Sequence, residues 1–121
     1  LTNKNITVYG DGSQTRSFCY VDDLVNGIFL MMKKENLAGP VNLGNPSEIS
    51  IYNLAQEIID LTGSKSKIIN KELPVDDPKQ RCPNIETANK ELGWQPSFDR
   101  EVGLKKTIEY FDELLNKEKL K

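Results

Sequence analysis

The first 24 residues combine a β-type run, a glycine-hinged loop and a helix start, and this order strongly restricts the fold. The β-branched and aromatic run from Ile6 to Tyr9 predicts a strand. The loop after it contains Gly10 and Gly12, which permit a positive φ and a close approach of the backbone to a ligand. Arg16 follows, and its planar guanidinium matches phosphate or carboxylate oxygens. The layout predicts an anion-binding loop.

Alternating strand and helix patterns continue along the chain and predict an α/β fold, with short strands and about four helices. The predicted strands cover residues 6–9, 41–43 and 67–69. Predicted helices begin at residues that can accept a capping hydrogen bond: Asp22, Ser50, Asn84 and Asp99. The second and third of these helices should end at Gly63 and Gly93.

Two further expectations concern packing. The helices from Asp22 and Ser50 should flank a buried 41–43 strand, because each helix has one apolar face. The stretch from Pro74 to Pro83 should hold no regular element, because prolines interrupt it. Leu120 should lie beyond the packed part of the last helix.

Composition indicates one small globular domain without a general affinity for nucleic acid. The chain has 121 residues, 37% hydrophobic and 28% charged, with a net charge of −2. A negative balance gives no attraction to nucleic acid or to an anionic membrane, so local arginines must hold an anionic ligand. Cys19 and Cys82 lack metal-site spacing and there is no histidine, so we expect no metal.

The compartment is predicted from what the sequence lacks. It contains no run of about 18 apolar residues and no signal peptide, which favours a cytoplasmic setting. A membrane anchor in a preceding segment stays an open alternative.

Four segments occur in an order that resembles a known family. They are Val8 to Leu24, Pro40 to Pro46, Asp76 to Pro83 and Leu92 to Pro96. The set resembles the extended short-chain dehydrogenase/reductase family, also called NAD-dependent epimerases/dehydratases, and is most similar to its UDP-glucuronate decarboxylases. Cys19 stands where some members of the family carry Gln, and Asn84 stands where Asp is expected; neither departure removes an expected ligand group.

Two motifs of that family are missing. A dinucleotide-binding turn needs closely spaced glycines between a strand and a helix, and no such run occurs. No tyrosine is followed four residues later by the lysine of the family's Tyr-x-x-x-Lys pair. The resemblance therefore implies that residues 1–121 are the C-terminal nucleotide-sugar-binding portion of a longer enzyme, without its N-terminal Rossmann part. It also implies NAD, bound mainly by that part, and a homodimer.

The resemblance implies a site for a UDP-sugar. Arg16 and Arg81 are expected to converge on the diphosphate from separate loops, with short charge-assisted bonds. Thr7, Val8 and Tyr9 are expected beside the uracil, which backbone N–H and C=O groups can read. The Gln14 amide suits a sugar hydroxyl or carboxylate.

Each of these residues also has a structural interpretation. Either arginine can form a surface ion pair with Asp22, Asp76 or Asp77. Tyr9 can be a packed aromatic, and Gln14 can be a turn amide. Asp23 and Trp94 are expected to be structural.

No catalytic residue is predicted in this chain, because no acid/base pair or nucleophile is visible. As the resemblance implies, the complete enzyme would use NAD to oxidise the sugar of UDP-glucuronate at C4, release CO2 and return the hydride to give UDP-xylose. A nucleotide-sugar 4,6-dehydratase or 4-epimerase of the same family is an alternative. A non-catalytic nucleotide-binding or interaction module is an alternative of another class.

We therefore expect the 121-residue chain alone to be inactive. It should neither bind NAD tightly nor release CO2 from UDP-glucuronate, because the dinucleotide turn and the Tyr-x-x-x-Lys pair are missing. Incubation of the purified chain with NAD and UDP-glucuronate, followed by measurement of CO2, checks this. Turnover would contradict it.

Overall fold

A computed structural model describes residues 1–37 and 39–119 and confirms the α/β class. Leu120 lies outside the described residues. The elements follow one another as β1 Ile6–Tyr9, β2 Thr15–Ser17, α1 Val21–Lys33, β3 Glu48–Ser50, α2 Ile51–Thr62, β4 Ile68–Lys71, β5 Gln80–Arg81, α3 Glu86–Leu92 and α4 Arg100–Lys119.

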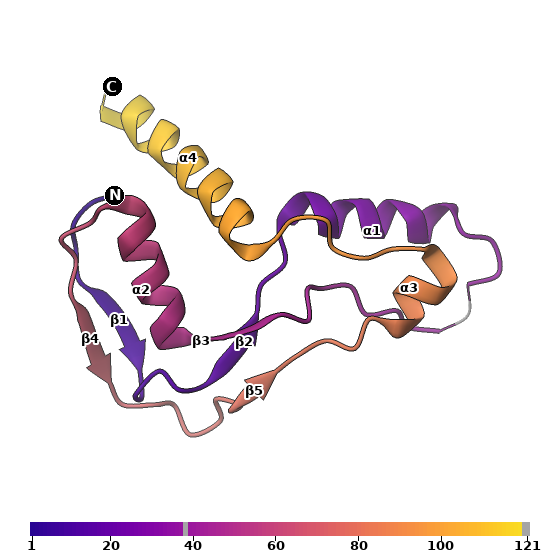
Figure 1. Ribbon diagram of the computed structural model, residues 1–121, viewed down its shortest axis with the longest axis horizontal. Helices are drawn as coiled ribbons and strands as arrows, with labels where there is room; N and C mark the ends of the chain where they lie inside the picture. Colours follow the sequence, from indigo (N-terminus) through magenta and orange to yellow (C-terminus); the bar gives the residue numbers. More distant parts are fainter. Residues whose placement is uncertain (38, 120–121) are drawn as a thin grey trace.

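The strands form two small sheets (Figure 1). In the first, β1 pairs in parallel with β4, from Ile6 beside Ile68 to Tyr9 beside Lys71. α2 packs against β1, where Val8 is buried. In the second sheet, β2 is the central strand, antiparallel to β3 and parallel to β5. Because β2 follows β1 after one short loop, that loop links the two sheets.

Local signals predicted several helix ends correctly. The side chains of Ser50 and Asp99 each accept a hydrogen bond from the amide three residues ahead, at 3.2 and 2.8 Å. Gly63 and Gly93 end α2 and α3 in the left-handed conformation, as predicted. The predicted cap at Asp22 is wrong, since α1 begins at Val21 and its capping residue, Tyr20, makes no side-chain capping bond.

The start of α3 also differs from the prediction. Its capping position is Ile85, one residue after Asn84. The Asn84 side chain instead accepts a 2.8 Å bond from the Glu86 amide and closes a turn before the helix. A short side-chain oxygen two residues ahead of an amide stabilises such a turn as readily as a helix start.

The predicted strand at residues 41–43 is not formed, and its flanking by two helices is wrong. α1 does contact Leu43, since a Cβ atom at Gly27 would come within 2.9 Å of that side chain. α2 lies instead beside β1 and β4, at the other end of the molecule (Figure 1). A strand requires a hydrogen-bonded neighbour, and no strand of residues 1–37 and 39–119 pairs with 41–43.

The second sheet was not predicted. The prediction that the stretch from Pro74 to Pro83 holds no regular element is wrong, because β5 lies inside it, where Pro78 and Pro83 flank the two paired residues without interrupting them. β2 and β3 each have three residues. Strands this short carry too little hydrophobic alternation to be recognised, because cross-strand partners stabilise them.

Asp23 joins the start of α1 to the segment that leads into α4. Its Oδ1 accepts bonds from the Ser97 amide and hydroxyl at 3.0 and 2.6 Å, and Oδ2 accepts one from the Phe98 amide at 2.9 Å. Its backbone oxygen accepts a 3.0 Å bond from the Trp94 indole N–H. Asp23 and Trp94 are 4% and 2% exposed, in agreement with the structural roles expected for them.

These bonds keep the Asp23 carboxylate ionised. Burial by itself would raise its pKa, but the bonds from the Ser97 side chain and from the Phe98 and Ser97 amides lower the pKa below the ordinary 3.8. Its stabilising contribution is therefore complete above the unfolded-state pKa and is lost as the pH falls through the lower folded-state pKa.

α1 also presents a row of exposed apolar side chains, which comprises Val21, Val25, Ile28, Phe29 and Met32. Among the described residues, no helix is both long and apolar enough to cross a membrane.

Asp23→Ala should destabilise the protein by about 1.5 to 3 kcal/mol, because it leaves the Ser97 and Phe98 donors without their charged acceptor. Asp22→Ala, at the exposed neighbouring acid, is the control and should change stability by less than about 0.5 kcal/mol. Denaturant unfolding measures both. The penalty of Asp23→Ala should shrink as the pH falls below about 3.8, and a penalty equal to that of Asp22→Ala would contradict the role.

Candidate functional site

The second sheet brings the two predicted arginines together. Arg16 on β2 and Arg81 on β5 are direct partners in the parallel register, although they are far apart in the sequence. Side chains of partner residues on adjacent strands leave the same face of a sheet. Arg81 is exposed, whereas the Arg16 side chain is 18% exposed. The sheet therefore places two cationic side chains next to each other, and their binding of one anion stays a prediction.

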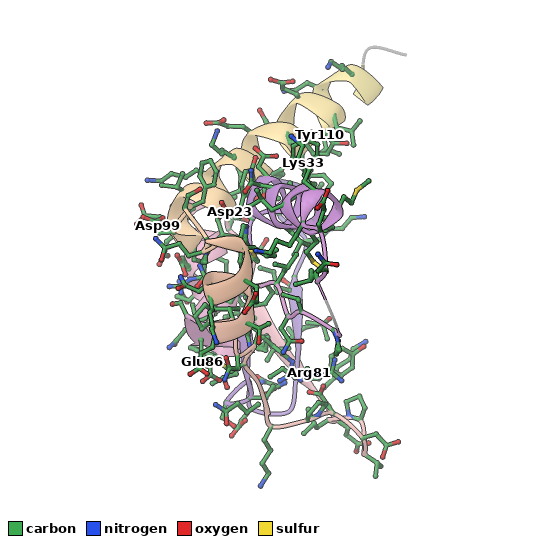
Figure 2. All side chains as sticks on the ribbon, turned by 90° about the vertical axis from the view of Figure 1, so that its right-hand side faces the viewer. Asp23, Lys33, Arg81, Glu86, Asp99 and Tyr110 are labelled. Carbon is green, nitrogen blue, oxygen red and sulfur yellow. The ribbon has the colours of Figure 1, made fainter. Side chains whose placement is uncertain are left out.

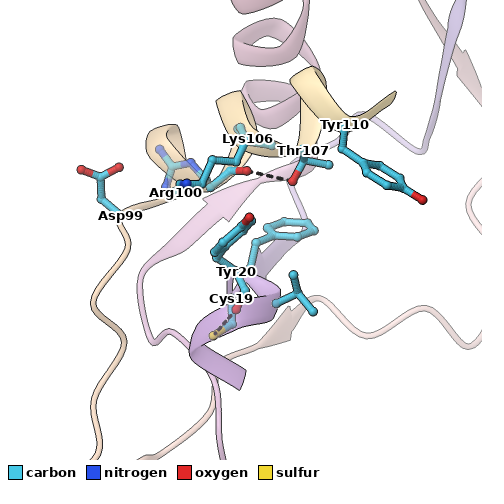
Figure 3. A pocket seen from close by; sticks show the side chains of 11 residues that line it. Cys19, Tyr20, Asp99, Arg100, Lys106, Thr107 and Tyr110 are labelled. Atoms are coloured by element: carbon cyan, nitrogen blue, oxygen red, sulfur yellow. Dashed lines mark hydrogen bonds between the residues drawn. The ribbon is translucent and has the colours of Figure 1, made fainter. Parts of the chain in front are cut away.

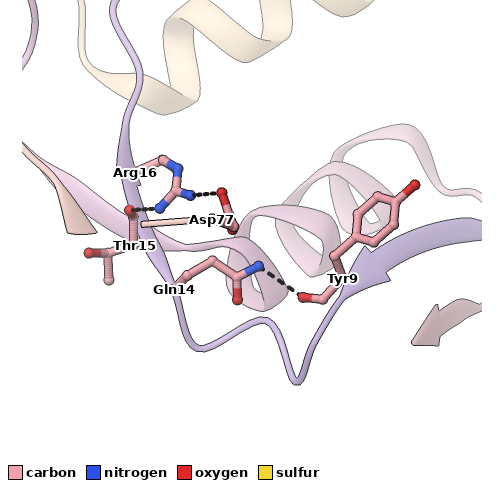
Figure 4. Close-up of polar contacts among 5 residues, drawn as sticks. All are labelled: Tyr9, Gln14, Thr15, Arg16 and Asp77. Atoms are coloured by element: carbon pink, nitrogen blue, oxygen red, sulfur yellow. Dashed lines mark hydrogen bonds and ion pairs between the residues drawn. The ribbon is translucent and has the colours of Figure 1, made fainter. Parts of the chain in front are cut away.

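Arg16 makes two hydrogen bonds within the chain (Figure 4). One guanidinium nitrogen, NH1, donates to the Thr15 carbonyl at 2.7 Å, and the other, NH2, donates to Asp77 Oδ1 at 2.6 Å. Asp77 was one of the carboxylates named for the alternative ion pair. A guanidinium has five N–H groups, so these two bonds leave donors for a further oxygen.

Glu48 connects the strands that carry the arginines. From β3, its Oε1 accepts a 2.6 Å bond from the Thr15 hydroxyl and its Oε2 accepts a 2.7 Å bond from the Gln80 side-chain amide. These two bonds, Thr15 first, lower the pKa of Glu48 below its ordinary 4.5. Thr15 and Gln80 directly precede Arg16 and Arg81, so Glu48 holds both strands in register.

Gln14 links the first sheet to the second. Its side-chain nitrogen donates a 2.9 Å bond to the Tyr9 carbonyl, and the residue is 8% exposed (Figure 4). This is the turn-amide arrangement named as the alternative for Gln14. The loop also lies on the start of α2, because Gly12 has a φ of +77° and a Cβ there would come within 2.9 Å of the Tyr52 amide.

The residues predicted beside the base lie on β1. Thr7, Val8 and Tyr9 pair with Ile69, Asn70 and Lys71 of β4, which uses one edge of the strand. No strand of the described residues pairs with the other edge. Tyr9 is 49% exposed and Val8 is 1% exposed, so Tyr9 is reachable from solvent and the Val8 side chain packs inside. Their contact with a base stays a prediction.

A cavity of about 510 Å³ lies elsewhere, between the start of α1 and α4 (Figure 3). Its lining includes Cys19, Tyr20, Arg100 and Tyr110, and none of the predicted site residues. Arg81 and Tyr110 lie at opposite ends of the molecule (Figure 2). Burial, with a further contribution from Asp23, raises the pKa of the Cys19 thiol, which disfavours a nucleophilic thiolate at neutral pH.

Sequence reasoning missed Glu48, because its partners lie on strands too short to predict. Within the described residues, no group of three or more His, Cys, Asp or Glu could hold a metal ion.

Comparison with known proteins shows that the chain is similar to nucleotide-sugar enzymes. Residues 1–44 match the model of the NAD dependent epimerase/dehydratase family. UDP-glucuronic acid decarboxylase 1 of Danio rerio is 50% identical over 111 residues, which are 92% of this chain and 26% of that protein. UDP-glucuronic acid decarboxylase 3 of Arabidopsis thaliana is 40% identical over 96% of this chain and 34% of its own length. The chain thus spans about a quarter to a third of these relatives.

Solved structures share the fold. The UDP-glucose 4-epimerase of Thermotoga maritima, bound to UDP-glucose, has a TM-score of 0.86 and 30% identity over 93% of this chain and 36% of its own. The UDP-glucuronic acid 4-epimerase of Bacillus cereus, bound to UDP-glucuronic acid and NAD, has a TM-score of 0.86 and 27% identity, with the same coverage.

Glu48→Ala should loosen the strands that carry the arginines, because Thr15 and Gln80 lose their shared acceptor. Amide hydrogen exchange at Thr15, which donates to the Lys79 carbonyl, should become faster. Glu72→Ala, at an exposed acid on the loop after β4, is the control.

The effect of Glu48 should depend on pH. Since its pKa is lowered, the bonds hold above the ordinary value of 4.5 and are lost as the pH falls through the lower folded-state value. The difference in exchange between the wild type and Glu48→Ala should therefore disappear in acid. Equal amide exchange at Thr15 in the two proteins at neutral pH would show that Glu48 does not hold β2 and β5 in register.

Proposed function

We propose that the chain, whose residues 1–44 match the NAD dependent epimerase/dehydratase family, is the UDP-sugar-binding part of an NAD-dependent UDP-glucuronate decarboxylase of that family. The complete enzyme would convert UDP-glucuronate to UDP-xylose and CO2. The observation that carries the proposal is the register pairing of Arg16 with Arg81, which puts two cationic forks beside one another on adjacent strands. The 50% identity to the Danio rerio decarboxylase supports the choice of reaction.

We propose that residues 1–121 form the C-terminal portion, preceded in the longer protein by the NAD-binding Rossmann part. The coverage of about a quarter of the Danio rerio relative supports this division. NAD, when bound, supplies a hydride acceptor for the sugar. The complete enzyme is proposed to be a cytoplasmic homodimer, and size-exclusion chromatography and cell fractionation test these two properties.

The part played by this chain is binding and orientation. Arg16 and Arg81 would hold the diphosphate through charge-assisted bonds. The edge of β1 at Thr7, Val8 and Tyr9 would read the uracil through backbone groups. Gln14 would approach the sugar. Its bond to the Tyr9 carbonyl connects the end of β1, proposed to lie beside the uracil, to the loop that leads into β2 and Arg16. Placement of this kind can lower a reaction barrier by several kcal/mol.

A UDP-sugar 4-epimerase is a second candidate, favoured by the TM-scores of 0.86 to two such enzymes. The products distinguish the two. A decarboxylase releases CO2 from UDP-glucuronate and leaves a pentose, whereas a 4-epimerase keeps the carboxylate and inverts C4. Incubation of the full-length protein with NAD and UDP-glucuronate, followed by NMR identification of the sugar, decides between them. A non-catalytic module would return the substrate unchanged.

Arg16→Ala and Arg81→Ala in the full-length protein should each weaken UDP binding by about 1.5 to 3 kcal/mol, or one to two decades in Kd, because each removes a charge-assisted contact to the diphosphate. Isothermal titration calorimetry measures the loss. Arg100→Ala is a matched control, since it breaks a 2.9 Å ion pair with Glu57 on α2 and leaves the sheet intact. Unchanged affinity in both site variants would refute the assignment.

A further inference from the structure

The Arg16 guanidinium already has an anionic partner within the chain. Asp77 Oδ1 lies 2.6 Å from NH2, and the two side chains are 28% and 18% exposed (Figure 4). A carboxylate and a phosphate present similar oxygens to a guanidinium fork. Asp77 therefore occupies a guanidinium donor that a phosphate oxygen could also use.

Asp77 belongs to the loop 72–79, which joins β4 to β5. The loop is mostly exposed, and Val75 is 100% exposed. Its described hydrogen bonds are few: the Asp77 amide donates to the Pro74 carbonyl at 3.2 Å, and the Lys79 carbonyl accepts from Thr15 at 2.9 Å. Among the described side-chain bonds, the one from Asp77 to Arg16 connects this loop to the arginine strand.

We propose that Asp77 is a displaceable internal substitute for the ligand's phosphate, so that diphosphate binding to Arg16 releases loop 72–79. This inference rests on the proposed function, because it assigns the exchange to the same arginine site. An incoming phosphate oxygen and the Asp77 carboxylate repel each other at one guanidinium nitrogen. The diphosphate carries the greater charge and also reaches Arg81, the register partner of Arg16.

The exposure of the pair makes the exchange feasible. Partly exposed ion pairs are weak, because solvent screens them and both side chains lose freedom. Asp77 therefore competes with the ligand without blocking it. Glu48, which binds uncharged partners on the arginine strands, stays in place during the exchange. The two acids thus have different roles: Glu48 connects the strands, and Asp77 competes with the ligand for Arg16.

Asp77→Asn tests the competition, because it keeps the shape of the side chain and removes its charge. Calorimetric titration of UDP into the full-length variant should show about two- to fivefold tighter binding than the wild type. Asp76→Asn, at the exposed neighbouring acid, is the matched control and should leave the affinity unchanged. In an Arg16→Ala background, Asp77→Asn should give no gain, because the competition needs the guanidinium.

A second measurement needs no ligand. Amide hydrogen exchange across loop 72–79, measured without ligand, should be faster in Asp77→Asn than in the wild type or in Asp76→Asn, since the bond from Arg16 to this loop loses its charge assistance. Unchanged exchange in Asp77→Asn would show that the contact between Asp77 and Arg16 does not hold loop 72–79 against β2.

The outcomes separate the two proposals. Wild-type binding of UDP that Arg16→Ala weakens, together with no gain in Asp77→Asn, overturns this inference and leaves the proposed function standing. Failure of the wild-type protein to bind UDP overturns both.

Discussion

The buried carboxylate of Asp23 is the interaction on which the arrangement of this chain most depends. It accepts three hydrogen bonds from Ser97 and Phe98, while its carbonyl holds the Trp94 indole. These bonds join the beginning of α1 to the connection between α3 and α4. Because α1 starts four residues after the end of β2, the same bonds also anchor the strand that carries Arg16. An apolar side chain at position 23 could pack there, but it could not satisfy these donors.

From this anchor, a second carboxylate organises the candidate site. Glu48 bonds to Thr15 on β2 and to Gln80 on β5, one residue before each arginine. The second sheet is small, and strands of two or three residues have little stability of their own. Side-chain bonds across it therefore matter more than they would in a large sheet. They allow Arg16 and Arg81 to stand side by side at a surface where cationic repulsion would otherwise separate them.

The candidate site places two arginines on adjacent strands beside an exposed surface. One of its cations is balanced within the chain, since Arg16 pairs with Asp77. If Asp77 is displaced as proposed, a site built in this way would select a multiply charged ligand over a singly charged one, because only the former can compensate for the loss of the internal pair. That selectivity suits the diphosphate of a nucleotide-sugar, which is the ligand class proposed for this chain.

Much of the local structure could be read from residue types. The β-type run at Ile6, the caps at Ser50 and Asp99 and the helix ends at Gly63 and Gly93 are each marked by residue types at neighbouring positions, so their signals are local. The ordered motifs also carried the resemblance that the 50% identical relative supports. Other features depend instead on contacts between segments more than 30 residues apart: the second sheet and the partners of Glu48 and Asp77. Residues 41–43 form no strand because no such partner lies beside them among the described residues. Such pairings leave no local pattern, because a two- or three-residue strand is stabilised by its neighbours and an ion pair by the fold that brings its members together.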